Sequence, residues 1–281
     1  MLRIFFLYII MLTLIPTPIG NPQDITIRAL RAFEKTNLFL CEDTRKTKHL
    51  LKLLEERFEM AYPSDAQFLS FNEHNGKERL KHVGDMLVHK CVSYVSDAGM
   101  PVISDPGQLL VDYCQTHNVA YDVLPGASAV TTAYAASGFE AGRFLFYGFL
   151  PHKGKERAVA LQEAMGNRYD TVLYEAPHRL EKLLTEIVQI DREREIFLAK
   201  EISKRYQTYY REKADFLLKE IGSGTIRGEW VVIVKGKAEC ERTLSLTELK
   251  SLELPPKVKA KLLAQVSEKS VKEWYEILSV K

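Results

Sequence analysis

Short apolar runs alternate with amphipathic stretches along most of this chain, and no other feature constrains its fold as much. The apolar runs are as short as buried strands usually are, and the stretches between them carry apolar residues at helical spacing. Because strands that alternate with helices build βαβ units, the pattern predicts an α/β protein with mostly parallel sheets. The expected strands are Leu12–Ile15, Leu38–Cys41, Cys91–Val95, Ala120–Leu124, Phe144–Phe149, Thr171–Tyr174, Ile196–Lys200 and Trp230–Val234. The expected helices include Asp24–Phe33, Gly76–Val88, Leu109–His117, Arg179–Ile190 and Lys213–Ile221.

Two changes in the sequence divide the chain into parts. The run VLPGASAV at 123–130 interrupts the middle, and the strand pattern stops near residue 240. The 281 residues are enough for two ordinary domains. We expect an N-terminal α/β domain at 1–125, a C-terminal α/β domain at 126–240 and a small helical tail at 241–281.

The tail carries clear helix-start signals. Ser245 with Glu248 and Ser270 with Glu273 have the spacing of capping boxes, and a double proline at 255–256 suits the first turn of a helix. The tail is mildly basic, and a solvated face is the simplest interpretation.

The N-terminus, MLRIFFLYIIMLTLIPTPIGN, has two interpretations. Arg3 and the apolar run resemble a signal peptide, but the run ends in prolines and lacks the small residues of a cleavage site. It is also shorter than the ~20 residues of a membrane span. We favour a buried first strand, with residues 1–10 as an upstream extension of the reading frame before Met11.

Composition excludes several classes of protein. The chain is 46% hydrophobic and 27% charged, the balance of a globular protein, and its net charge of +2 does not indicate a bulk nucleic-acid binder. The four cysteines (Cys41, Cys91, Cys114 and Cys240) form no CxxC pair and the seven histidines are scattered, so no metal is expected. Buried free thiols in a reducing compartment predict a cytoplasmic protein without a membrane anchor.

The segment SYVSDAGMPVISDPG, at 93–107, places two aspartates in a constrained loop. Asp105, before Pro106 and Gly107, suits a helix start because its carboxylate accepts from unpaired backbone N–H groups. Asp97 directly follows a buried strand, and α/β sheets bind ligands at the carboxyl ends of strands. Ala98 and Gly99 would let a ligand approach the backbone closely. The alternative for Asp97 is a turn-forming role.

Three other strands are followed by loops of the same kind: TPIGN, PGASA and YEAPHR. Loops at strand ends that meet at the sheet edges would build one cleft. The chain has neither the GxGxxG nor the GxxxxGK[ST] pattern, which disfavours a dinucleotide site or a P-loop, and it has no GxSxG or HExxH motif. Charged clusters adjoin these loops, such as CEDTRKTKH and LPHKGKER. Each is either a solvated surface or a contact for nucleic-acid phosphates.

Eight motifs together resemble a known family. They occur in the expected order, and the similarity covers about residues 12–281. The chain resembles the bacterial small-subunit (16S) ribosomal RNA cytidine 2′-O-ribose methyltransferases, a branch of the tetrapyrrole-methylase superfamily. The motifs are PTPIGNPQDITIRAL, EDTRKTKHLL, VSDAGMPVISDPG, LPGASAV, GFLPHKGKER, YEAPHRL, KEISK and RGEWVVIVKG.

The resemblance implies two α/β domains with S-adenosylmethionine bound in the cleft between them. It also implies a homodimer, and a substrate cytidine in the decoding region of small-subunit ribosomal RNA, free or in the 30S subunit. The residues that it assigns to the cofactor, beside the YEAPHR segment, are Ile19, Gly20, Asp97, Ala98, Gly99, Met100, Ser128 and Ala129.

Some positions depart from the pattern of that family. Ala127 and Ala176 replace a common proline and serine, which changes only loop packing, and Lys46 replaces a common histidine. Asn72 and Glu73 also differ from the usual residues. Gln207 stands where a glutamate is frequent, so the charge at that position is in question.

Transfer of a methyl group to a ribose hydroxyl depends mainly on alignment. Alignment of the reacting atoms contributes ~7–11 kcal/mol, and a positioned base adds roughly 10²–10⁴-fold. The candidates for helping the hydroxyl are Glu42, Asp43, Glu175 and Glu201, with Glu73 as a further carboxylate. The candidates for holding RNA are Arg45, Lys153, Arg157, His178 and Arg179.

Three other functions are compatible with parts of this sequence. A tetrapyrrole C-methylase usually carries a GxGxGD-like first loop, whereas TPIGN has no Asp after its glycine. A non-catalytic RNA-binding homologue would bind the cofactor without methyl transfer. A dinucleotide oxidoreductase would need the glycine fingerprint that this chain lacks.

Overall fold

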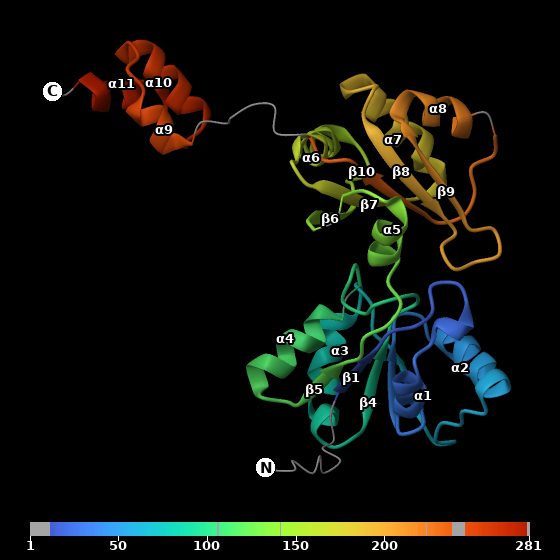
Figure 1. Cartoon of the computed structure of the whole chain (residues 1–281). Helices are drawn as coiled ribbons and strands as arrows, with labels where there is room; N and C mark the ends of the chain where they lie inside the picture. Colours follow the sequence, from blue (N-terminus) through green and yellow to red (C-terminus); the bar gives the residue numbers. More distant parts are fainter. Residues whose placement is uncertain (1–11, 106, 141, 223, 238–244, 280–281) are drawn as a thin grey trace, which may run out of the picture. The chain divides into compact units, whose positions relative to one another are not determined.

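The computed structural model describes residues 12–105, 107–140, 142–222, 224–237 and 245–279. The chain divides into two compact units, one ending at Gly236 and the other starting at Lys237 (Figure 1). The proposed extension at residues 1–10 and the helix-start role of Pro106 lie outside the described residues. In the part that is described, no helix is long and apolar enough to cross a membrane.

The first sheet is parallel throughout, as predicted. Its order is β3-β2-β4-β1-β5, and Leu14 of β1 lies opposite Tyr94 of β4 and Val123 of β5. The edge strand β3 was not predicted, because QFLS lacks an apolar run and none of its residues is fully buried. The strands are β1 Leu12–Ile15, β2 Leu38–Cys41, β3 Gln67–Ser70, β4 Val92–Val95 and β5 Tyr121–Val123.

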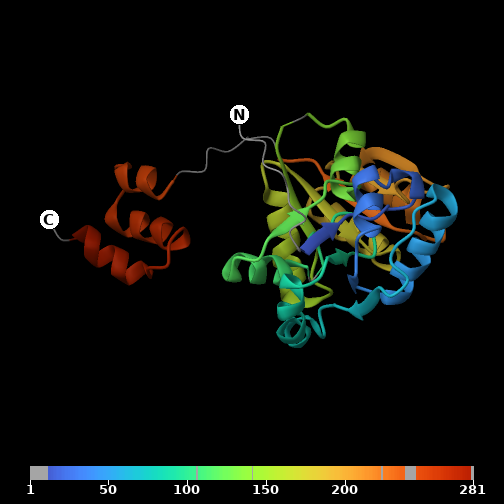
Figure 2. The same ribbon diagram turned by 90° about the horizontal axis from the view of Figure 1, so that it is seen from below.

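Helices cover both faces of this sheet, so its central strands are buried on both sides (Figures 1 and 2). The helices α1 and α2 pack on one face, and α3, η2 and α4 pack on the other. The first predicted helix begins later than expected, because the Thr26 hydroxyl caps α1 by accepting from Ala29 N. The helices are η1 Pro22–Asp24, α1 Ile27–Phe33, α2 Thr44–Phe58, α3 Gly76–Val83, η2 Gly84–Val88 and α4 Gln108–His117.

The second sheet is mainly antiparallel, so the prediction of mostly parallel sheets is wrong here. Its order is β6-β7-β10-β8-β9; β6 and β7 are parallel, whereas β7–β10, β10–β8 and β8–β9 are antiparallel. The link from β8 to β9 is too short for a crossover helix, which forces an antiparallel pair. The strand β9, TYYREK, was missed because it is an exposed polar edge. The strands are β6 Phe144–Phe149, β7 Asp170–Glu175, β8 Glu195–Lys200, β9 Thr208–Lys213 and β10 Trp230–Val234.

Four helices pack on the second sheet. The helices α6, α7 and α8 cover one face, and α5 packs on the other. They are α5 Ala129–Ser137, α6 Gly154–Gly166, α7 Pro177–Ile190 and α8 Ala214–Gly222.

The C-terminal unit has three described helices, α9 Leu246–Ser251, α10 Pro256–Gln265 and α11 Val271–Ser279. They share a small core of their own, built on Leu249, Leu263 and Trp274. Both predicted capping boxes are present, since each serine exchanges hydrogen bonds with the glutamate three residues later. The helix start predicted at the double proline is also confirmed.

The free cysteines largely agree with the sequence analysis. Cys41 and Cys114 are buried, and burial raises the pKa of Cys41 to about 12 and that of Cys114 to about 11. These thiols therefore stay protonated at neutral pH. Cys91 is half-buried, less than expected, and Cys240 lies outside the described residues.

Leu14 in the middle of β1 provides a test of this core. Its side chain is fully buried, so Leu14→Ala should lower the free energy of unfolding by about 2–5 kcal/mol in urea denaturation followed by circular dichroism. Leu145→Ala is the control, because Leu145 is 38% exposed. Equal costs for the two variants would contradict the central position of β1.

Candidate cofactor and active site

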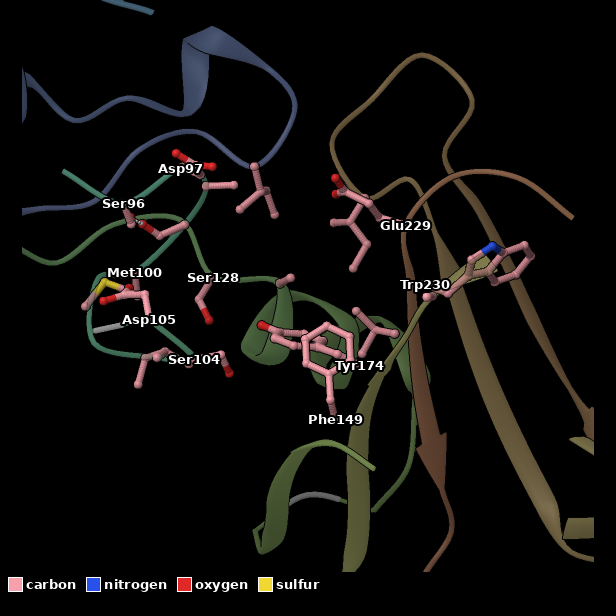
Figure 3. Close-up of a pocket in the computed structure, with 18 of the residues that line it drawn as sticks. Ser96, Asp97, Met100, Ser104, Asp105, Ser128, Phe149, Tyr174, Glu229 and Trp230 are labelled. Carbon is pink, nitrogen blue, oxygen red and sulfur yellow. Dashed lines mark hydrogen bonds between the residues drawn. The ribbon is translucent and has the colours of Figure 1, made fainter. Parts of the chain in front are cut away.

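A cavity of about 560 Å³ lies where loops of the first sheet face strand ends of the second (Figure 3). Loops that follow β1, β4 and β5 form one side, and residues at the ends of β6, β7 and β10 form the other. All the residues expected at the cofactor except Gly20 line this cavity, namely Ile19, Asp97, Ala98, Gly99, Met100, Ser128 and Ala129.

Asp97 joins two neighbouring loops. Its Oδ1 accepts from Asp43 N at 3.1 Å and its Oδ2 accepts from Lys46 Nζ at 2.5 Å. The backbone N–H of Asp97 in turn donates to Glu42 Oε2 at 3.1 Å. The loops after β2 and β4 are therefore held together by reciprocal bonds, in which each carboxylate accepts from the other loop.

Gly99 connects the same loop to TPIGN. Thr17 and Gly99 exchange two backbone hydrogen bonds, of 3.1 and 3.0 Å, as an antiparallel bridge. Gly99 has a φ of +81°, which favours glycine, and a Cβ there would meet Ile19 Cγ2 at 3.1 Å. The loops that follow β1, β2 and β4 therefore form one connected wall.

Asp105 organises the remainder of this segment. Its Oδ1 accepts from Tyr94 Oη at 2.9 Å and Gly107 N at 2.8 Å, and its Oδ2 accepts from Val102 N at 2.8 Å. Burial raises the pKa of Asp105, although these hydrogen bonds oppose the shift. As predicted, the carboxylate serves backbone N–H groups. However, it supports the loop before α4, whose N-cap is Gly107.

Gly20 has a different position from the one expected. It does not line the cavity, but a Cβ at Gly20 would lie 2.4 Å from Lys204 Cγ and 3.0 Å from Ile202 O. Nearby, the Ser203 hydroxyl hydrogen-bonds Asp24. Gly20 therefore allows the loop after β8 to approach the TPIGN loop, and its role is contact between the two sheet regions.

Aromatic side chains that the sequence analysis did not single out line the far side of the cavity. Phe149 ends β6, and its ring centroid lies 5.5 Å from that of Tyr174 near the end of β7. Trp230 begins β10, yet it reaches the same edge because antiparallel pairing sets it opposite Glu175. The positions of Phe149 and Tyr174 at strand ends were a usable signal, whereas the direction of β10 had none in the sequence.

The candidate catalytic carboxylates Glu42 and Asp43 differ in environment. Glu42 is half-buried and lines the cavity, and burial raises its pKa. Asp43 does not line the cavity; it caps α2 by accepting from Arg45 N at 2.8 Å and pairs with the Arg45 side chain at 2.7 Å. The hydrogen bond from Arg45 holds the pKa of Asp43 well below its usual range. Asp43 is therefore placed as a helix cap.

Glu175 lines the cavity but is enclosed by two arginines. Its Oε1 lies 3.0 Å from Arg179 Nε, and its Oε2 lies 3.5 Å from Arg157 Nη2. Arg157 is 2% exposed and also pairs with Glu186 at 2.9 Å, while Arg179 donates to Leu150 O at 2.7 Å. In this structure the guanidinium groups of Arg157 and Arg179 are engaged within the protein, and their expected contact with RNA phosphates stays a prediction.

Glu201 also has a structural environment. It lies outside the cavity lining, where its Oε1 accepts from Glu229 N at 2.8 Å and from Lys204 Nζ at 3.0 Å. Gly228, with a φ of +86°, leaves the space that the Glu201 side chain occupies. Gln207 accepts from Ser203 N through its amide oxygen, a contact that does not require a charge. Glu201 therefore supports the loop after β8 in this structure, and its catalytic role stays a prediction.

The remaining candidates lie on the surface outside the cavity lining. Lys153, His178 and Glu73 are exposed, and the Arg45 side chain is 89% exposed. Exposed groups around a pocket suit a large polyanionic partner better than a small ligand. Glu73 has no access to the interior of the cavity in this arrangement.

The cavity fits the expected cofactor. Its volume lies within the ~300–1,000 Å³ of ordinary small-molecule sites, and it combines apolar and aromatic walls with backbone polar groups. Small residues at 98, 99, 128 and 129 leave that backbone accessible. Within the described ranges, no three His, Cys, Asp or Glu side chains cluster in a way that would hold a metal ion.

Comparisons with known proteins agree on one family. The model of the tetrapyrrole (corrin/porphyrin) methylases matches residues 11–217. The ribosomal RNA small subunit methyltransferase I of Helicobacter pylori (strain 26695) is 42% identical over 277 residues, covering 94% of this chain and 96% of that protein. The protein of the same name from Campylobacter fetus is 39% identical over 270 residues, covering 95% and 99%.

A solved structure shares the fold at low identity. The uroporphyrin-III C-methyl transferase of Thermus thermophilus, complexed with S-adenyl homocysteine, aligns with a TM-score of 0.55. The alignment covers 80% of this chain and 97% of that chain at 14% identity. Likeness at this level supports the architecture alone.

Asp97 provides a test of the cavity as the cofactor site. Asp97→Ala removes two hydrogen bonds that join the loops, and bonds to charged groups contribute about 1.5–3 kcal/mol, so affinity for S-adenosylmethionine should fall roughly 10- to 100-fold. Calorimetric titration measures this, with Asp85→Ala as the control because Asp85 is exposed in η2. Unchanged affinity in Asp97→Ala would contradict the assignment.

Proposed function

We propose that this chain methylates the 2′-hydroxyl of a cytidine ribose in small-subunit ribosomal RNA. The chain belongs to the tetrapyrrole (corrin/porphyrin) methylase family and, within it, to the ribosomal RNA small subunit methyltransferases. The family membership confirms the resemblance seen in the motifs. The chain is an S-adenosylmethionine-dependent methyltransferase of the predicted α/β class. The cytidine and its 2′-oxygen are the finer part of the proposal.

The observation that carries the proposal is the cavity itself. It brings together loops that are far apart in the sequence, and the residues expected at the cofactor line it. The relatives named as ribosomal RNA methyltransferases match this chain over nearly its whole length, so the similarity includes both sheets and the C-terminal helices.

The chemistry requires alignment more than it requires strong acids or bases. S-adenosylmethionine, when bound, supplies a methyl group that its sulfonium already activates. The linked loops at 17–20, 42–46 and 96–100 give a fixed wall against which the reacting atoms are held in line, and such alignment contributes ~7–11 kcal/mol. Phe149 and Tyr174 give the opposite side an aromatic surface.

The RNA would be held by cationic groups outside the cavity. Arg45 is 89% exposed in the first turn of α2, three residues after the cavity residue Glu42. Lys153 is exposed on the loop that follows β6, and His178 is exposed in the first turn of α7, which follows β7. We assign these three residues to contacts with phosphates on either side of the target ribose.

The remaining expectations are part of the same proposal. A homodimer, a cytoplasmic location and domain boundaries at 125/126 and 240/241 follow from the resemblance and from the sequence pattern. The tetrapyrrole alternative is disfavoured by the TPIGN loop, and visible absorbance of the purified protein would reveal a bound porphyrinoid. A non-catalytic homologue would bind S-adenosylmethionine without transferring its methyl group.

Methyl transfer from radiolabelled S-adenosylmethionine tests the reaction directly. Small ribosomal subunits and free ribosomal RNA from cells that lack this protein are offered as substrates. We expect label on the ribose 2′-oxygen of one cytidine, mapped by nuclease digestion and mass spectrometry. Label on a base, or no label although the cofactor binds, would refute the proposed substrate while leaving the family assignment intact.

Arg45 separates RNA binding from cofactor binding. Arg45→Ala should weaken RNA binding and lower the slope of log affinity against log salt by about one unit, because one phosphate contact is lost. Affinity for S-adenosylmethionine should stay unchanged. Arg31→Ala is the matched control, since Arg31 is also exposed and paired with a nearby carboxylate, Glu34. Loss of cofactor binding in Arg45→Ala would refute this role.

A further inference from the structure

Five carboxylates line the cavity, and most of them are committed to neighbouring groups. Both oxygens of Asp97 accept hydrogen bonds, from Asp43 N and Lys46 Nζ. Both oxygens of Asp105 do so as well, from Gly107 N and Val102 N among others. Such groups hold the loops in place, and each of their oxygens is already engaged by a donor of the protein.

The two carboxylates of the second sheet region are also unsuitable as proton acceptors. Glu175 has a side chain with no exposed surface, between the guanidinium groups of Arg179 and Arg157. Glu229 is 76% exposed and lies 3.0 Å from the ammonium group of Lys204. Each of these two carboxylates is therefore paired with a cationic side chain.

Within the part of the chain that is described, Glu42 differs from the two aspartates and Glu175 in having an oxygen without a partner, and from Glu229 in being half-buried and in no ion pair. Its Oε2 accepts from Asp97 N at 3.1 Å, which sets the direction of the side chain, whereas Oε1 has no hydrogen-bond or ion-pair partner among the described residues. Since no buried polar side-chain atom in that part of the chain lacks a partner, Oε1 must reach open space. Glu42 therefore combines a fixed orientation with one accessible oxygen in the cavity.

We propose that Oε1 of Glu42 accepts the proton of the ribose 2′-hydroxyl during methyl transfer, an inference that rests on the proposed function. The ribose oxygen forms a bond to the methyl carbon while the carbon–sulfur bond breaks, and the electron pair of that bond stays on sulfur. The hydroxyl proton passes to Glu42 and then to solvent. The neutral thioether product and the methylated ribose complete the balance.

The charges around Glu42 suit this role. Burial raises its pKa, the carboxylates of Asp97 and Asp105 raise it further, and the Asp97 N–H and the Lys46 ammonium oppose the shift. A base whose pKa moves towards the working pH accepts a proton more effectively. Because the ionised form is the active one, the rate should rise with pH as Glu42 loses its proton and then level off.

Single-turnover kinetics between pH 5.5 and 9, with saturating S-adenosylmethionine and small ribosomal subunits, test the proposal. Glu42→Gln keeps the oxygen that accepts from Asp97 N but removes the base, so the rate should fall roughly 10²–10⁴-fold and lose its acidic limb. Cofactor affinity should stay within about twofold of the parent. Glu42→Asp should retain the acidic limb at a reduced rate. Glu78→Gln, at an exposed glutamate of α3 outside the cavity lining, is the control.

The following outcomes would contradict the proposal. A Glu42→Gln rate within about threefold of the parent, or an unchanged acidic limb, would exclude Glu42 as the base. A loss of cofactor affinity that matches the loss of rate would show a structural role only. If the parent itself labels no 2′-oxygen, the proposed function fails first. That result needs no variant, and it would also refute the role of Glu42 as the base.

Discussion

The reciprocal hydrogen bonds between Glu42 and Asp97 and their loops are the interaction on which the rest of the site depends. The strands β2 and β4 are parallel neighbours, so their following loops leave the sheet at the same edge. Each loop supplies a carboxylate to a backbone N–H of the other, which satisfies polar groups that would otherwise be buried without partners. The Thr17–Gly99 bridge extends this connection to the loop after β1. One wall of the cavity is thus a continuous hydrogen-bonded unit.

The opposite wall depends on buried charge. Arg157 joins Glu175 to Glu186, and Arg179 donates to the backbone carbonyl of Leu150 at the end of β6. Buried ion pairs of this kind add little net stability, but removing one partner is costly because it leaves an uncompensated charge. The positions of the two arginines are therefore explained by the geometry that they impose on the loops after β6 and β7, rather than by contact with a ligand.

Features that depend on residues close together in the sequence were predicted correctly, whereas features that depend on distant residues were not. Apolar runs such as that of β1 were predicted because burial of consecutive side chains is visible locally, and the loop at 96–100 was found because it follows such a run. The strand β9 and the antiparallel course of β10 were not predicted, because an exposed edge carries little apolar signal and strand direction depends on distant partners. For the same reason, the position of Trp230 at the cavity was not predicted. The burial of Arg157 was not predicted, because the sequence of a charged cluster does not reveal which members are buried.

The sequence by itself determined the alternation of elements, the helix caps of the C-terminal unit, the loops that carry the cofactor residues and the family, since each of these is written in short contiguous motifs. Only the tertiary structure decided which carboxylate has an oxygen free to act. In the sequence alone, nothing distinguishes the carboxylates of Glu42, Asp43, Glu175 and Glu201 as candidate bases. Glu42 and Glu175 differ because other elements bring the Asp97 N–H and Arg157 beside them, whereas Asp43 and Glu201 pair with Arg45 and Lys204 of their own segments. Hydrogen bonding and desolvation act through space.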